Sequence, residues 1–115
     1  MPHFVIDCSE KILKLQQPEH IILEVHKTAA ATKLFDEGDI KVRLNPFKEH
    51  YLVGGVPGDF IHVFANIMEG RTTIQKADLS RSIVSTLKAM FPSVDFIAIN
   101  INDFEKATYC NKSMV

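Results

Sequence analysis

Pro2 is the residue of this chain whose type and position could support the most unusual chemistry. It opens a short apolar run, residues 4–8, whose β-branched content predicts a buried strand. Proline tolerates the first position of a strand because it has no N–H to donate, and for the strand alone this is the simpler explanation. If Met1 is removed, however, the ring nitrogen of Pro2 becomes a secondary amine anchored by the strand. An amine held in this way is a candidate general base.

An amine must be neutral to accept a proton. An ordinary α-amino group titrates near ~8. Burial in an apolar pocket, or the approach of cations, disfavours the charged form and lowers the pKa. A base poised near neutral pH is the kind that general acid–base catalysis uses. The rest of the chain should therefore supply apolar walls and anchors for an anionic substrate.

Three basic residues are candidates for those anchors. Arg71 stands just before a predicted helix, whose N-terminus binds anions, and its guanidinium can hold a carboxylate through two parallel hydrogen bonds. Lys41 and Arg43 alternate along a predicted strand, residues 40–44, and so share one of its faces. An arginine tolerated in a turn and a solvated strand face are the simpler explanations. Together with Pro2, Arg71 favours an anion site, and either Lys41 or Arg43 could contribute to it.

Composition limits the classes of protein to consider. The chain has 115 residues, which predicts one domain over residues 1–115, and its formal net charge is −1 from 13 basic and 14 acidic residues. This balance argues against a nucleic acid or an anionic membrane as a partner recognised by bulk charge. No apolar run approaches the ~20 residues of a membrane span, and no basic segment followed by an apolar one opens the chain. We therefore expect a soluble, cytoplasmic protein.

Cysteine and histidine residues give no sign of a metal or a disulfide. Cys8 and Cys110 are far apart, and neither belongs to a Cys-x-x-Cys pair, so we interpret them as inert thiols of a reducing compartment. His20 and His26 lie on a predicted helix without a spacing typical of metal ligands. His62, inside an apolar strand, is interpreted as a core or interface histidine. We expect no metal and no cofactor.

The predicted elements form two strand–helix–strand units. Each unit should be a right-handed crossover with parallel strands, and two units give an α+β fold with one mixed sheet and two helices on one face. The apolar runs also predict an apolar open face, which implies association, and a closed ring is the economical solution. The polar tail, residues 104–115, could be disordered or could lie on a neighbouring subunit. The elements are strands 4–8, 40–44, 59–68 and 94–102, and helices 18–34 and 73–91.

Several boundaries and faces follow from local signals. Asn45-Pro46 should end the second strand, because proline cannot continue a central ladder. Thr72 and Gln75 match a capping box at the start of the second helix, which Pro92 stops. In the last strand, alternate positions should face opposite sides, with Phe96, Ala98 and Asn100 on one and Ile97, Ile99 and Ile101 on the other. The predicted buried stripe of the second helix is Ile74, Ala77, Val84, Leu87 and Phe91.

The first residues also resemble a known family. Residues 2–9, Pro-His-Phe-Val-Ile-Asp-Cys-Ser, are similar to the start of the 5-carboxymethyl-2-hydroxymuconate delta-isomerases of the tautomerase superfamily. Shorter similarities occur at residues 29–32, 40–43 and 70–72. The resemblance implies a tautomerase-like fold and a homotrimer with sites near subunit boundaries. It also implies isomerisation of 5-carboxymethyl-2-hydroxymuconate, an intermediate in the breakdown of homoprotocatechuate.

These observations give one hypothesis and three alternatives. In the hypothesis Pro2 moves a proton as base and then acid, while Arg71, with Arg43 or Lys41, binds the carboxylates or the developing dienolate oxygen. The first alternative is another tautomerase activity, on phenylpyruvate or 4-oxalocrotonate. The second is a non-catalytic ferredoxin-like binding module, and the third is a partner-binding protein assembled through its open sheet face.

Overall fold

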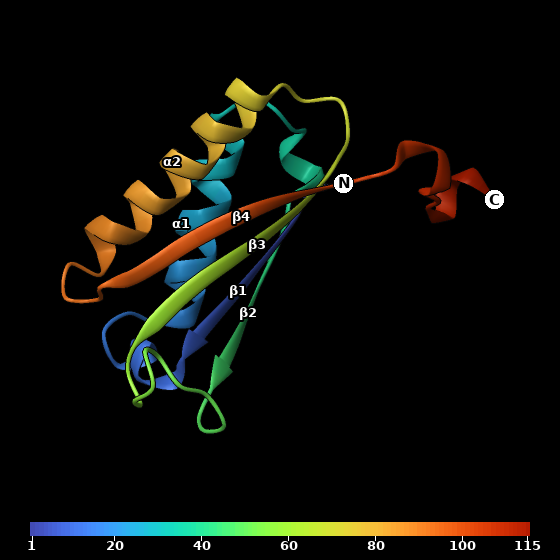
Figure 1. The fold of residues 1–115 in the computed structure, drawn as a ribbon. Helices are drawn as coiled ribbons and strands as arrows, with labels where there is room; N and C mark the ends of the chain where they lie inside the picture. Colours follow the sequence, from blue (N-terminus) through green and yellow to red (C-terminus); the bar gives the residue numbers. More distant parts are fainter.

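Four strands form one mixed sheet in the order β2-β1-β3-β4. The computed structural model describes all residues, 1–115. Strands β1 and β2 pair in parallel, as do β3 and β4, while β1 and β3 pair antiparallel. Both strand–helix–strand units therefore have the predicted parallel strands. The elements are β1 His3–Ser9, α1 Pro18–Ala31, β2 Lys41–Phe47, β3 Phe60–Met68, α2 Thr73–Met90 and β4 Phe96–Phe104, with short 3-10 segments at Glu10–Lys14, Glu37–Asp39, Lys106–Thr108 and Lys112–Met114 (Figure 1).

Both long helices cover the same face of the sheet (Figure 1). This confirms the predicted α+β arrangement. The core lies between the helices and the sheet. Its residues follow the two periodicities of the sequence, every second residue in the strands and every third or fourth in the helices. None of the helices has both the length and the hydropathy that crossing a bilayer requires. The fully buried core side chains include Phe4 and Ile6 of β1, Ile61 and Val63 of β3, Val25 of α1, and Leu79, Ile83 and Leu87 of α2.

Helix α1 begins at Pro18 as predicted but ends at Ala31, three residues before the predicted end. The reason is the backbone of Lys33, whose φ of 62° lies in the left-handed region and cannot continue the helix. The chain therefore turns early. This turn brings Leu34 and Phe35 over the start of β1.

Helix α2 has the predicted capping box. The backbone N–H of Gln75 donates to the Thr72 hydroxyl at 3.1 Å, and the Gln75 side chain accepts from the Thr72 N–H at 2.9 Å. The predicted burial of Ile74 was wrong, because this side chain is 75 % exposed. The buried stripe runs through Leu79, Ile83 and Leu87. Ile74 lies five residues before Leu79, about 140° around the helix, and so faces away from the sheet.

Strand β2 continues to Phe47, so the prediction that Asn45-Pro46 ends it was wrong. The position of β2 in the sheet gives the reason. It lies at the edge, where proline is tolerated because one side of the strand has no ladder partner. Pro46 pairs in register with Cys8 on the inner side.

The open face of the sheet is mixed, not apolar as predicted. Phe60 and Phe64 alternate with buried residues and so face away from the helices, but His62 lies between them on the same side. The imidazole Nε2 of His62 lies 2.6 Å from Oδ1 of Asn100 on β4. Ile97, Ile99 and Ile101 pack against the core, which confirms the predicted alternation of that strand. The open face thus carries both aromatic side chains and a pair of polar side chains in contact with each other.

Candidate functional site

Pro2 is buried directly before β1, one of the two inner strands of the sheet. Its carbonyl oxygen accepts a hydrogen bond of 3.0 Å from the backbone N–H of Lys41, at the start of β2. The alternation of β1 places Pro2 on the same face as Phe4, towards the helices. Pro2 is therefore held by a backbone hydrogen bond to the start of β2 and faces the helical layer, as a positioned base requires.

A cavity of about 310 Å³ lies beside Pro2. It brings together Pro2 and Arg71, two residues that are far apart in the sequence. Its remaining walls come from the turn after α1 and from the segment before β2. The lining residues are Met1, Pro2, Lys33, Leu34, Phe35, Asp36, Asp39 and Arg71.

Arg71 is fixed by three contacts at the edge of this cavity. Its Nη2 donates to the carbonyl oxygen of Leu34 at 2.7 Å, and its Nη1 donates to that of Met68 at 3.2 Å. Its guanidinium carbon lies 4.9 Å from the centroid of the Phe35 ring. Because a guanidinium has five N–H donors, these contacts leave others for a ligand.

The turn before Arg71 depends on Gly70. Its φ of 122° is a conformation that residues with a side chain rarely adopt. The turn places Arg71 directly before the capped N-terminus of α2. A second hollow of about 350 Å³ shares Lys33, Leu34 and Arg71 with the cavity, so the guanidinium borders both.

The terminal amine lies in a setting that favours its neutral form. Burial lowers the pKa of the amino group, carried here by Met1, below its usual value of 8.0. Among its neighbours, Arg71 and Lys41 lower this pKa further, whereas Asp39 and Asp36 raise it. The amine thus lies between charges of opposite sign, and burial, the largest effect, lowers its pKa.

Lys41 and Arg43 lie outside this cavity of the same chain. They share the open face of the sheet, because Val42 and Leu44 between them pack against the core. The ammonium group of Lys41 donates to the Asp39 carbonyl at 3.1 Å. The structure therefore brings Arg71, but neither of these two residues, into the cavity beside Pro2.

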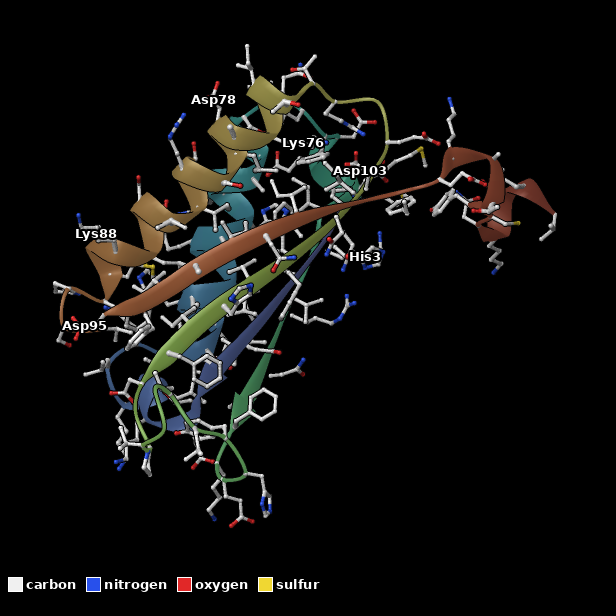
Figure 2. All side chains as sticks on the ribbon, viewed as in Figure 1. His3, Lys76, Asp78, Lys88, Asp95 and Asp103 are labelled. Atoms are coloured by element: carbon white, nitrogen blue, oxygen red, sulfur yellow. The ribbon has the colours of Figure 1, made fainter.

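Arg43 instead contacts His3. Its Nη1 lies 3.1 Å from Nδ1 of His3, and Figure 2 shows His3 on the side of the strands away from the helices. Because a guanidinium can only donate, Nδ1 of His3 accepts and carries no proton. Burial lowers the pKa of His3, and the charges of Arg43 and Lys41 lower it further. His3 is therefore neutral beside two cations.

A larger hollow of about 540 Å³ lies at the other end of β1. Its lining is polar and charged, and it includes none of the residues predicted from the sequence. No group of three or more His, Cys, Asp or Glu side chains is placed to hold a metal ion. Residues of this hollow include Lys11, Lys48, Glu49, His50, Tyr51 and Asp59.

The sequence profile of the 5-carboxymethyl-2-hydroxymuconate isomerase family matches residues 2–108. The chain belongs to this family. It is thus a member of an isomerase family, as the resemblance of its first residues implied. No curated protein sequence matches the chain.

Solved structures show the same fold. A 5-carboxymethyl-2-hydroxymuconate isomerase from Deinococcus radiodurans R1 has a TM-score of 0.82 and 19% identity, over 96% of this chain and 88% of that one. Pt0534 inactivated by 2-oxo-3-pentynoate has a TM-score of 0.84 and 17% identity, over 98% and 94%. A fused 4-OT described as a symmetric trimer has a TM-score of 0.81 and 15% identity, over 98% and 96%.

Sequence reasoning missed the part of the cavity that follows α1 in this isomerase family member. Lys33, Phe35, Asp36 and Asp39 were not among the predicted site residues, although all four line the cavity. A usable signal was present in the topology. Because β1 and β2 are parallel, they begin at the same edge of the sheet, so the segment before β2 must lie near Pro2.

Proposed function

We propose that this protein is a cofactor-independent isomerase of 5-carboxymethyl-2-hydroxymuconate in which the Pro2 amine moves the proton. The observation that carries the proposal is the shared cavity of Pro2 and Arg71. Membership of the isomerase family supports the reaction class. Pro2 supplies the proton carrier, and Arg71 supplies a fixed cation within the same space.

The reaction needs one group that accepts and then returns a proton. After removal of Met1, the neutral Pro2 nitrogen takes the proton of the 2-hydroxyl group, and the electron pair of that O–H bond spreads over the conjugated system. The resulting dienolate takes the same proton back at a carbon, which forms a C–H bond and leaves a ketone at the former hydroxyl. No atom is gained or lost, so one amine serves as base and then acid.

The charges around the amine suit both steps. Burial lowers the pKa of the Met1 amino group, whose place the Pro2 amine takes once Met1 is removed, and so favours the neutral form that accepts a proton. Asp39 and Asp36 raise this pKa and so favour the protonated form that returns the proton. Arg71 can bind a substrate carboxylate or the dienolate oxygen through its free N–H groups. Lys33, which also lines the cavity, adds a second cation.

We also propose a homotrimer in which Lys41 and Arg43 act across a subunit boundary. These cations lie on the open face of the sheet, outside their own chain's cavity, and could bind the second carboxylate in a neighbour's site. The half-exposed aromatic side chains of that face support association. The fused 4-OT structure, described as a symmetric trimer, has the same fold. Free thiols at Cys8 and Cys110 fit a cytoplasmic location. The proposed substrate is an intermediate in homoprotocatechuate breakdown.

The test is turnover of three substrates by protein of verified N-terminal sequence. Interconversion of the conjugated enol and the ketone is followed by absorbance for 5-carboxymethyl-2-hydroxymuconate, phenylpyruvate and 4-oxalocrotonate. We expect the highest kcat/KM with the hydroxymuconate. A higher value with either of the others would assign a different tautomerase activity to the same site. Turnover of none, by protein that has lost Met1, would support a non-catalytic binding module.

A further inference from the structure

The C-terminal arm, residues 105–115, leaves the body of the molecule instead of folding onto it (Figure 1). No residue of the arm is buried. The radius of gyration is 14.9 Å, whereas a compact chain of this length has about 13 Å. The principal extents are 44 × 26 × 25 Å, so the molecule is long in one direction only. The arm therefore adds nothing to the core of its own chain.

The arm nevertheless has a defined conformation. Two short 3-10 turns, Lys106–Thr108 and Lys112–Met114, follow one another along it. The Asn111 carboxamide oxygen accepts from both the backbone N–H and the hydroxyl of Ser113, at 3.1 and 2.7 Å. The Tyr109 ring stacks on Phe104 with centroids 5.5 Å apart. The arm therefore has local order of its own, although it lies away from the body of the molecule.

The end of the arm is apolar and has no cover within its own chain. Met114 is 61 % exposed and Val115 is 96 % exposed. Exposure of apolar side chains to water is unfavourable in free energy, and burial against a second surface is favourable. Tyr109 presents a further amphipathic side chain near the middle of the arm.

The arm begins at the end of the sheet where the cavity lies. The backbone N–H of Lys106 donates to the Glu69 carboxylate at 2.7 Å, and the Glu69 N–H donates to the Phe104 carbonyl at 3.0 Å. Glu69 precedes Arg71 by two residues. Strands β1 and β4 both pair with β3, where Asn66 is in register with His3 on one side and with Asn102 on the other. The arm and the Pro2 cavity thus belong to one end of the molecule.

The cavity itself lacks an apolar cover. Only Met1, Leu34 and Phe35 among its eight lining residues have apolar side chains other than proline, and removal of Met1 would leave two. Four of the others carry charge. A site that moves a proton between oxygen and carbon works best when closed to water. The cavity therefore needs a wall that its own chain does not supply.

We infer that the arm of one copy seats on a second copy of this chain and closes the Pro2 cavity there. This inference rests on the proposed homotrimer. In a ring, identical copies can each give an arm to the next and receive one from the previous, so every cavity is closed by the same contact. The arm supplies the apolar cover through side chains such as Tyr109, Met114 and Val115.

The chain carries a natural probe for this contact. Cys110 lies in the arm and is exposed, whereas Cys8 is buried, and burial raises the pKa of its thiol to about 11. A maleimide therefore reacts with Cys110 alone. In a Lys33→Cys variant the second reactive thiol lies in the cavity wall, and in a Lys11→Cys variant it lies in the hollow at the far end of β1. A short bismaleimide is added to each variant and to the unsubstituted chain.

We expect the Lys33→Cys variant to give a cross-linked species of twice the chain mass in denaturing electrophoresis. Addition of Cys110→Ser to it should abolish that species, and the Lys11→Cys variant should not form it. Cross-linking within one chain only, or through Lys11→Cys instead of Lys33→Cys, would overturn the inference. Native mass spectrometry separates the two proposals. A trimer without the cross-link refutes the arm contact alone, whereas a monomer refutes the assembly as well.

Discussion

The guanidinium carbon of Arg71 lies 4.9 Å from the centroid of Phe35, whose ring meets Phe4 edge-on at a centroid distance of 6.1 Å. These contacts connect the Arg71 guanidinium at the cavity to Phe4, a core residue of β1. None of the ion pairs of the molecule involves Arg71. Its charge is therefore positioned by an aromatic face and two carbonyl oxygens, and no carboxylate of the protein neutralises it.

Replacement of Arg71 by alanine should weaken turnover of dianionic substrates more than that of monoanionic ones. A hydrogen bond to a charged group contributes about 1.5–3 kcal/mol, which corresponds to about 10–100-fold in kcat/KM. The control is Arg81→Ala, which removes an exposed guanidinium that pairs only with Asp78, at 3.8 Å. Steady-state kinetics with both substrate classes provides the measurement. Equal losses for the two classes would contradict a carboxylate-binding role.

Replacement of Pro2 by alanine should reduce kcat by about 10²–10⁴-fold, the usual contribution of a positioned acid–base group. Alanine leaves a primary amine or a different N-terminus, so the mass of the intact protein must be determined for each sample. Pro92→Ala, at the exposed end of α2, is the matched control because it also removes a proline. A Pro2→Ala enzyme with unaltered kcat would exclude the amine as the proton carrier.

The pH profile should respond in opposite directions to neighbours of opposite charge. The amine acts as a base, so kcat/KM should rise with pH through its pKa, and a lower pKa moves this rise to lower pH. Asp39 raises the pKa of the Met1 amino group, whose place the Pro2 amine takes, so Asp39→Asn should shift the rise to lower pH. Lys41 lowers it, so Lys41→Ala should shift the rise to higher pH. Shifts of the same sign in both variants would be inconsistent with electrostatic control of this amine.

Gly70 should be needed for the stability of the protein. Its φ of 122° strains any residue with a side chain, although no atom lies within 4 Å of where a Cβ would be. We expect Gly70→Ala to lower the free energy of unfolding by about 1–3 kcal/mol. Gly38→Ala, where neither an unusual φ nor a close contact exists, is the control. Urea unfolding of the two variants at one protein concentration is the measurement. Equal midpoints for Gly70→Ala and Gly38→Ala would contradict a special role for the backbone conformation of Gly70.

The fold was predictable because local signals and topology agreed. The capping box at Thr72 and the alternation of residues 96–101 appear in the structure as the sequence indicated. The errors had a common origin in tertiary position. Pro46 continues a strand because that strand is at the edge, and the open face is mixed because every second residue of an apolar run can be polar, as at His62.

The candidate site was predictable only in part. Pro2 and Arg71 have residue types that suggest chemistry, and the structure places them together. Asp36 and Asp39 are ordinary acidic residues of a loop, and only the parallel pairing of β1 with β2 brings them to the amine. The alternation of residues 40–44 shows that Lys41 and Arg43 share a face of the strand. It does not show which face of the sheet that is, or whether a cavity lies there.

The most direct test of the account is a titration of the Pro2 nitrogen itself by ¹⁵N NMR, on protein labelled at proline. We predict a secondary amine whose pKa lies below that of an N-terminal proline in water, as burial lowers the pKa of the Met1 amino group, and coincides with the midpoint of the rise in kcat/KM with pH. An amide signal from Pro2 in active protein, or an amine whose pKa is at or above the ordinary value, would contradict the central claim.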